Sequence, residues 1–242
     1  KDKKINIEGK FNSQFDLTEN EIKKLLIKSN VKFLDNNKLN MQGLLLHNFT
    51  FKIDENYKLI DYDYKSNGNI SQSQIVLKDY FKNNFIKKPI KKLSIYKTNL
   101  TININKKNKN LLMIDGLYNL GGDENKKFKI SHDLNKKNPR YFIDFDLAEN
   151  IFLKFINFKS NSKNKSNIKS EINFLNKKTI FKYIKFTEDR NLITINDLSI
   201  NSKNEIASIS GVEVKTFNGN EENNNFKISF KNKISVTGKN YD

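Results

Sequence analysis

The chain contains no cysteine and no tryptophan, and it has only two prolines and two histidines. Without cysteine it has no disulfide framework, thiol nucleophile or cysteine zinc site. The histidines, His47 and His132, are each isolated in the sequence, so we interpret both as core or surface residues and expect no metal, cofactor or catalytic triad. Nowhere does the chain reach the roughly eighteen consecutive apolar residues of a membrane-spanning helix. We therefore expect a protein that is not an enzyme.

Arginine is also scarce, although the net charge is +17. Of the 44 basic residues only Arg140 and Arg190 are arginines, and 42 are lysines. Specific nucleic-acid readers favour the planar fork of arginine for bidentate contacts, whereas lysine supplies only charge. The lysines are spread along the chain without a basic arm. We attribute the charge chiefly to compositional bias and solubility, with attraction to anionic headgroups or nucleic acid as the lesser alternative, and we expect no nucleic-acid partner.

What the sequence does contain is alternation of apolar and polar residues. In the last segment Phe226, Ile228 and Phe230, and then Ile234 and Val236, recur at every second position, which is the period of a strand with one apolar face. Similar runs, separated by short connections, favour an antiparallel meander. The predicted strands are Lys4–Phe11, Val31–Leu34, Leu39–Ile53, Leu59–Tyr64, Ile70–Leu77, Leu93–Ile104, Leu111–Leu117, Lys127–Ser131, Tyr141–Leu147, Ile151–Asn157, Ile168–Leu175, Ile180–Phe186, Leu192–Ile200, Glu205–Phe217, Asn225–Lys231 and Lys233–Gly238.

Turn and helix signals are few. Residues that tolerate positive φ predict reversals at Asn67–Asn69, Gly121–Asp123 and Asn218–Asn220. Thr18 and Glu21 have the spacing of a capping box and predict a short helix over Glu19–Ser29. A second short helix is predicted over Asp79–Lys88, ended by Pro89.

Most strands have a single apolar face. In the strand that begins at Tyr141, Ile143, Phe145 and Leu147 share one side, whereas Asp144 and Asp146 lie on the other. We interpret this carboxylate pair, like Asp61 and Asp63, as part of a solvated face beside lysines. Strand Leu192–Ile200 alternates less regularly and predicts a bulge. Strands of this kind pair their apolar faces in a sandwich or curl into an open gutter.

The order of elements from Tyr141 to Asp242 resembles the AsmA-like superfamily of Gram-negative envelope proteins, in particular its large members with a domain of unknown function joined to an AsmA-like C-terminal region. The segments that carry the resemblance are Ile143–Ala148, Phe155–Lys159, Ile193–Ile200, Ile209–Phe217 and the closing strand Ile234–Asp242. Residues 1–140 match only in their general strand character. Lys159–Ser162 replaces the Lys-Pro-Gly turn of related proteins, and Asn218–Glu221 replaces their Gly-Asp.

The resemblance implies a mainly β fold, a long twisted antiparallel meander that forms an open hydrophobic groove with one or two short helices. It implies a β-rich segment over residues 1–140, continuous with an AsmA-like sheet over residues 141–242, both part of a longer chain. Such a protein lies in the periplasm, is anchored to the inner membrane by a segment outside this sequence, and carries phospholipids between the inner and outer membranes by contacting their acyl chains. The residues expected to line the groove are Ile143, Phe145, Leu147, Ile193, Ile195, Phe226, Ile228 and Phe230.

A rival interpretation is a structural or adhesion-type β-sandwich repeat of a secreted or periplasmic protein, in which the apolar faces only meet each other. A closed core would distinguish it from an open concavity. The lipid cargo, the direction and energy source of transport, and the oligomeric state stay open at this stage.

Overall fold

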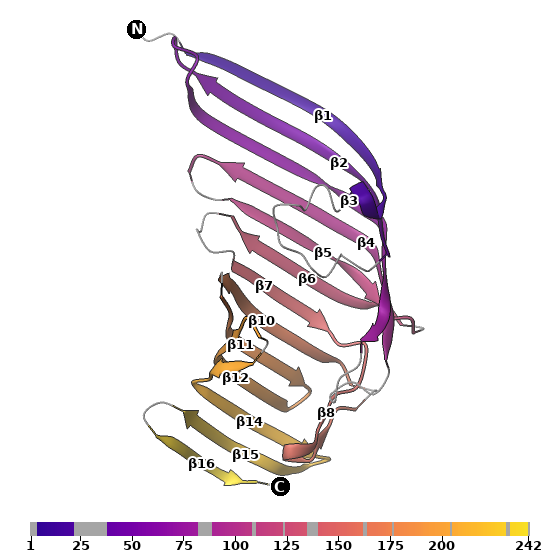
Figure 1. Cartoon of the computed structure of the whole chain (residues 1–242), viewed down its shortest axis with the longest axis vertical. Coiled ribbons are helices and arrows are strands. Elements are labelled where there is room, and N and C mark those ends of the chain that lie inside the picture. Colours follow the sequence, from indigo (N-terminus) through magenta and orange to yellow (C-terminus); the bar gives the residue numbers. More distant parts are fainter. Residues whose placement is uncertain are drawn as a thin grey trace. The chain divides into compact units, whose positions relative to one another are not determined.

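The computed structural model describes residues 4–21, 38–81, 89–107, 110–122, 124–134, 140–161, 164–175, 177–203, 205–230 and 233–241. The chain divides into two compact units, unit 1 with strands β1 to β6 and unit 2 with strands β7 to β16. Both are built from antiparallel strands (Figure 1), which confirms the predicted mainly β meander. No helix among these residues is long and apolar enough to cross a bilayer.

In unit 1 each strand pairs with the next one along the chain. This order is that of an antiparallel meander, as the sequence predicted. The strands are β1 (Ile5–Leu17), β2 (Lys38–Ile53), β3 (Leu59–Phe81), β4 (Ile90–Asn105), β5 (Leu111–Asn119) and β6 (Lys126–Asp133).

In unit 2 the main sheet has the order β7-β10-β11-β12-β14-β15-β16, with β13 paired to β12 and a separate ladder of β8 and β9. The strands are β7 (Arg140–Asp146), β8 (Phe152–Leu153), β9 (Phe158–Lys159), β10 (Ser166–Leu175), β11 (Lys178–Glu188), β12 (Asn191–Asn201), β13 (Ile206–Ser208), β14 (Gly211–Asn218), β15 (Glu221–Phe230) and β16 (Ile234–Asn240). The predicted strand Glu205–Phe217 is thus divided between β13 and β14. The expected irregularity in β12 lies at Asp197, which has a φ of 48°.

The turn predicted at Asn67–Asn69 is wrong, because these residues lie inside the continuous strand β3. Gly68 does not have a positive φ. Instead it lies close to β2: a Cβ atom at this position would stand 2.0 Å from the carbonyl oxygen of Leu44 and 2.8 Å from Cδ2 of Leu45. The glycine therefore permits a close approach of two strands. The reversal predicted at Asn218–Asn220 is confirmed, and Gly219 has a φ of 61°.

The first helix prediction is confirmed as far as the structure describes it. Residues 19–21 are helical, and the carboxylate of Glu21 accepts hydrogen bonds from the backbone nitrogen and Oγ1 of Thr18 at 2.8 and 2.7 Å. The rest of Glu19–Ser29 and the predicted strand Val31–Leu34 lie outside the described residues. The second helix prediction is wrong for residues 79–81, which belong to β3, and residues 82–88 lie outside the described part.

Candidate functional site

The candidate site is the apolar face of the main sheet in unit 2. Directly opposed residues of antiparallel strands lie on the same face, and so do residues two apart on one strand. The register therefore builds two adjacent rows that cross the sheet from β7 to β15. Row A consists of Phe145, Ile168, Phe186, Ile193, Val214 and Phe226. Row B consists of Ile143, Ser170, Ile184, Ile195, Val212 and Ile228.

Six of the eight groove residues predicted from the sequence fall in these rows, three in each. The seventh, Leu147, follows β7 and packs against the buried part of row A. The eighth, Phe230, is half-buried at the end of β15, opposite Ile234 of β16. The structure thus brings the predicted residues to one region of one face, and lipid contact stays a prediction.

A short segment between β7 and β10, Ile151–Ser160, covers row A, and we call it the strap. The sequence predicted a strand over Ile151–Asn157, which is confirmed at β8 and wrong beyond it: the backbone makes a 3-10 turn at Lys154–Ile156, and Asn157 adopts the left-handed conformation with a φ of 44°. The turn points Ile156 and Phe158 at the sheet. Their side chains are 0% and 4% exposed, in one cluster with Phe186, Ile193, Val214 and Phe226.

Polar contacts hold the strap at its middle and next to its C-terminal end. Asn224 of β15 donates a hydrogen bond from Nδ2 to the carbonyl oxygen of Ile156 at 2.9 Å, and both residues are fully buried. The backbone nitrogen of Asn161, next to the strap, donates to Oε1 of Glu188 at 2.9 Å. Within the strap, the backbone nitrogen of Ile151 donates to Oγ of Ser160 at 2.7 Å. Because these buried groups are hydrogen-bonded, the strap is an integral cover and not a loose loop.

Row B is less covered than row A. Its hydrophobic side chains are only half-buried, and Val236 of β16, which continues the row beyond Ile228, is 63% exposed. Tyr141 lies on the same face as Ile143, and burial raises the pKa of its hydroxyl above the ordinary value. Val212 and Ile228 of row B pack against the cluster under the strap, whereas Ile143, Ile184 and Ile195 are half-buried and lie outside that cluster.

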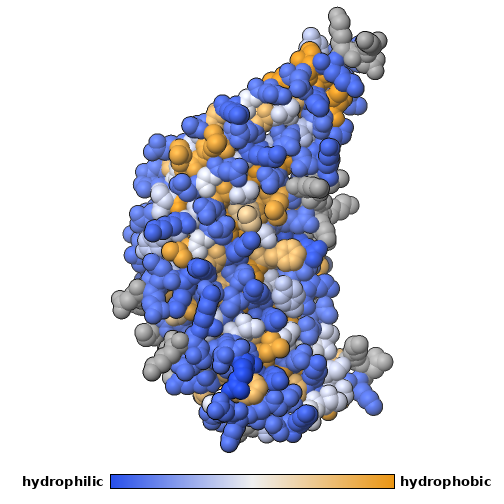
Figure 2. Space-filling model, turned by 180° about the vertical axis from the view of Figure 1, so that it is seen from behind, coloured by the Kyte–Doolittle hydropathy of each residue, from blue (hydrophilic) through white to orange (hydrophobic). Residues whose placement is uncertain are grey.

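Unit 1 has an apolar sheet face of its own. The register places large apolar residues of β1 and β2 opposite each other, for example Ile7 and Phe51, and glycines beside rings, for example Gly9 and Phe49. Phe11 on this face is 50% exposed. The face is therefore only partly sheltered among the described residues. Figure 2 shows one side of the molecule, on which hydrophobic residues form separate patches among hydrophilic ones.

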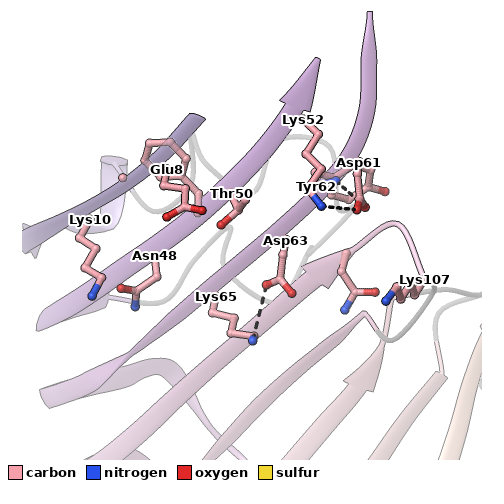
Figure 3. Close-up of a pocket in the computed structure, with 13 residues that line it drawn as sticks. Glu8, Lys10, Asn48, Thr50, Lys52, Asp61, Tyr62, Asp63, Lys65 and Lys107 are labelled. Carbon is pink, nitrogen blue, oxygen red and sulfur yellow. Dashed lines mark hydrogen bonds and ion pairs between the residues drawn. The ribbon is translucent and has the colours of Figure 1, made fainter. Parts of the chain in front are cut away.

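The opposite face of unit 1 carries charged side chains around a shallow depression of about 780 Å³ (Figure 3). Lys52 and Asp61 lie 3.9 Å apart, and Lys65 and Asp63 lie 3.7 Å apart. In unit 2, Lys169 and Asp144 lie 3.0 Å apart. These contacts agree with the interpretation of Asp61, Asp63 and Asp144 as solvated residues beside lysines, whereas the side chain of Asp146 is only 13% exposed and lies 3.3 Å from Lys165. The described residues contain no group of three or more His, Cys, Asp or Glu that could hold a metal ion.

The sequence did not predict the strap, nor that it buries row A of the sheet in unit 2. Alternation indicates which residues share a face, but it does not show which of them a covering segment reaches. A signal was available in Asn157, a residue type that tolerates the left-handed conformation in which the 3-10 turn ends.

No family model, curated protein or solved structure matches the chain.

Proposed function

We propose that this chain is a non-enzymatic segment of an envelope protein that shelters phospholipid acyl chains as they pass between the inner and outer membranes. The observation that supports this best is row B, an apolar row that crosses unit 2 and that the strap leaves half-exposed. Its predicted members are Ile143, Ile195 and Ile228. The resemblance of the sequence to AsmA-like proteins points to the same task.

The physical reason is the transfer free energy of hydrocarbon. Each CH₂ group that leaves water for an apolar surface gains about 0.8 kcal/mol. An acyl chain along row B and its neighbours therefore needs no chemical step to be held away from water. Headgroups would stay in water at the rim of the apolar face.

The test compares two adjacent positions of β12 whose side chains lie on opposite faces. Ile195 belongs to row B and pairs with Ile184, whereas Thr194 pairs with Lys185. A photo-crosslinking amino acid is placed at either position in the 242-residue chain, which is mixed with phospholipid vesicles and irradiated. We expect lipid adducts, detected by mass spectrometry, from position 195 and few from position 194. Equal yields at both positions, or no adduct at either, would contradict the proposal.

A second candidate is the structural module with a closed core, and the strap over row A favours it. The two candidates differ in what Ile184→Asp does, since Ile184 lies opposite Ile195 in row B and outside the cluster under the strap. If row B binds lipid, the variant keeps its fold and loses the adducts at position 195. If row B is part of a closed core, the buried charge unfolds unit 2, which circular dichroism detects.

A further inference from the structure

A polar triad interrupts the apolar face of unit 1. The Nε2 atom of His47 lies 2.7 Å from Oγ of Ser13, and its Nδ1 atom lies 2.7 Å from the hydroxyl oxygen of Tyr64. The three residues come from β2, β1 and β3, and their sequence separations are 34 and 17 residues. The triad is thus a product of the fold and not a sequence motif.

The surroundings of the triad are apolar. The imidazole of His47 is 7% exposed, and the ring of Phe11 stacks on it with centroids 4.3 Å apart. The register places no Lys, Arg, Asp or Glu on this face of β1 or β2. The same holds for the paired segments of β3 (residues 62–75) and β4 (residues 93–104). In such a setting each hydrogen bond is strong and each unmatched polar group is costly.

The triad has one more donor hydrogen than its two hydrogen bonds use. Neutral histidine carries one N–H, and Ser13 and Tyr64 carry one O–H each, so three donor hydrogens serve two contacts. Whichever ring nitrogen holds the hydrogen, one hydroxyl hydrogen is left over. In the described part of the chain neither hydroxyl makes another hydrogen bond.

A second donor lies beside the first. Ser66 is directly opposite His47 in the register, on the same face, and is fully buried. Its hydroxyl has no hydrogen-bond partner among the described residues. Because Ser66 is fully buried, its hydroxyl is out of reach of a ligand, and only the triad can offer a hydrogen to one.

We infer that Ser13, His47 and Tyr64 form a seat for the acceptor-only oxygen at the head of an acyl chain, with the hydrocarbon tail on the apolar face around it. The inference rests on the proposed function and adds to it the chemistry of the ligand. A carboxylate and an ester carbonyl both fit, because each accepts hydrogen bonds and donates none.

The experiment measures displacement of a neutral fluorescent dye, N-phenyl-1-naphthylamine, from the 242-residue chain. The competitors are oleate, methyl oleate and octadecene, which share a long chain and differ in the head. We compare the unaltered chain with the double variant Ser13→Ala, Tyr64→Phe. The control is Tyr62→Phe, which removes a hydroxyl from the same face of β3 outside the triad.

We expect the double variant to weaken the competition by oleate, by methyl oleate or by both about three- to tenfold, and to leave octadecene unchanged. The competitor that loses more identifies the source of the oxygen, carboxylate or ester. The control should change none of the three. An equal change for all three competitors, or no change, overturns the seat and leaves the proposed function standing. Failure of every competitor to displace the dye from the unaltered chain contradicts the proposed function as well.

Discussion

Asn224 of β15 holds Ile156 of the strap through a hydrogen bond of 2.9 Å between two fully buried residues that are 68 positions apart in the sequence. The same amide also donates to Oγ1 of Thr216 on β14 at 3.0 Å. One side chain thus connects the strap to two strands of the sheet.

We expect Asn224→Ala to lower the free energy of unfolding by about 1–3 kcal/mol, because it leaves the buried carbonyl oxygen of Ile156 without its donor. The neighbouring Asn225→Ala is the control. Asn225 is half-buried and donates to Glu222 at 2.8 Å, so its loss should cost less than about 1 kcal/mol. Urea unfolding followed by circular dichroism measures both. Equal losses would mean that the strap contact contributes nothing specific.

The packing of the strap is tested by two adjacent residues. Ile156 is 0% exposed and Phe155 is 59% exposed. Ile156→Ala should reduce the free energy of unfolding by about 2–5 kcal/mol, since it removes buried methyl groups and leaves a cavity over row A. Phe155→Ala should stay within about 0.5 kcal/mol of the unaltered chain. The reverse order in thermal or urea unfolding would show that the strap does not cover the sheet.

The correction at Gly68 also has a direct test. In Gly68→Ala the new methyl group would meet backbone atoms of Leu44 and Leu45, which cannot move aside as a side chain can. We expect a loss of about 1–3 kcal/mol in unfolding free energy. Gly122→Ala, at a position with nothing within 4 Å of the added Cβ, should be almost neutral. A neutral Gly68→Ala would show that β2 does not approach this glycine closely in solution.

Stability in acid should depend on Asp197. Its hydrogen bond with Lys182, at 3.2 Å, and a second one with Ser210 hold the pKa of this carboxyl below its ordinary value. A lowered pKa in the folded state stabilises the fold above the unfolded-state value, near 4, and that contribution disappears as the pH falls through the folded-state value. Asp197→Asn keeps a residue type that tolerates the left-handed backbone and removes only the charge.

We therefore expect Asp197→Asn to lower stability by less than about 1 kcal/mol at neutral pH, since the ion pair is exposed, and to flatten the loss of stability below pH of about 4. Urea unfolding midpoints measured from neutral to acidic pH give this slope. A variant whose acid slope equals that of the unaltered chain would show that the Lys182 and Ser210 contacts do not form in solution.

The sequence predicted which residues share the apolar face of a strand, but not which of them the strap covers, and the reason is physical. Alternation fixes which side of a strand each residue occupies, so Ile193 and Ile195 could be assigned to one face before the pairing was known. Only the fold shows that Ile193 lies under the strap and is 6% exposed, whereas Ile195 lies in the half-buried row B. Ile151, Leu153 and Phe155 alternate like a strand, and the local pattern carries no trace of the buried Asn224 that holds the turn.

The polar triad could not be predicted for a related reason. His47 looked isolated because its partners, Ser13 and Tyr64, belong to other strands. Their approach depends on the register of β1 with β2 and of β2 with β3. Two bulges shift the pairing of β2 with β3, one of them next to Gly43, and sequence patterns do not place such bulges.

The chain order of the sheet strands also bears on synthesis at the ribosome. Each main strand of unit 2 pairs with a strand close to it in sequence, so hairpins can form one after another as the chain emerges. The strap is the exception. It leaves the ribosome before β10, yet its buried amide partner arrives only with β15, so the hydrogen bond that holds the strap to the sheet can form only when nearly the whole unit has been translated.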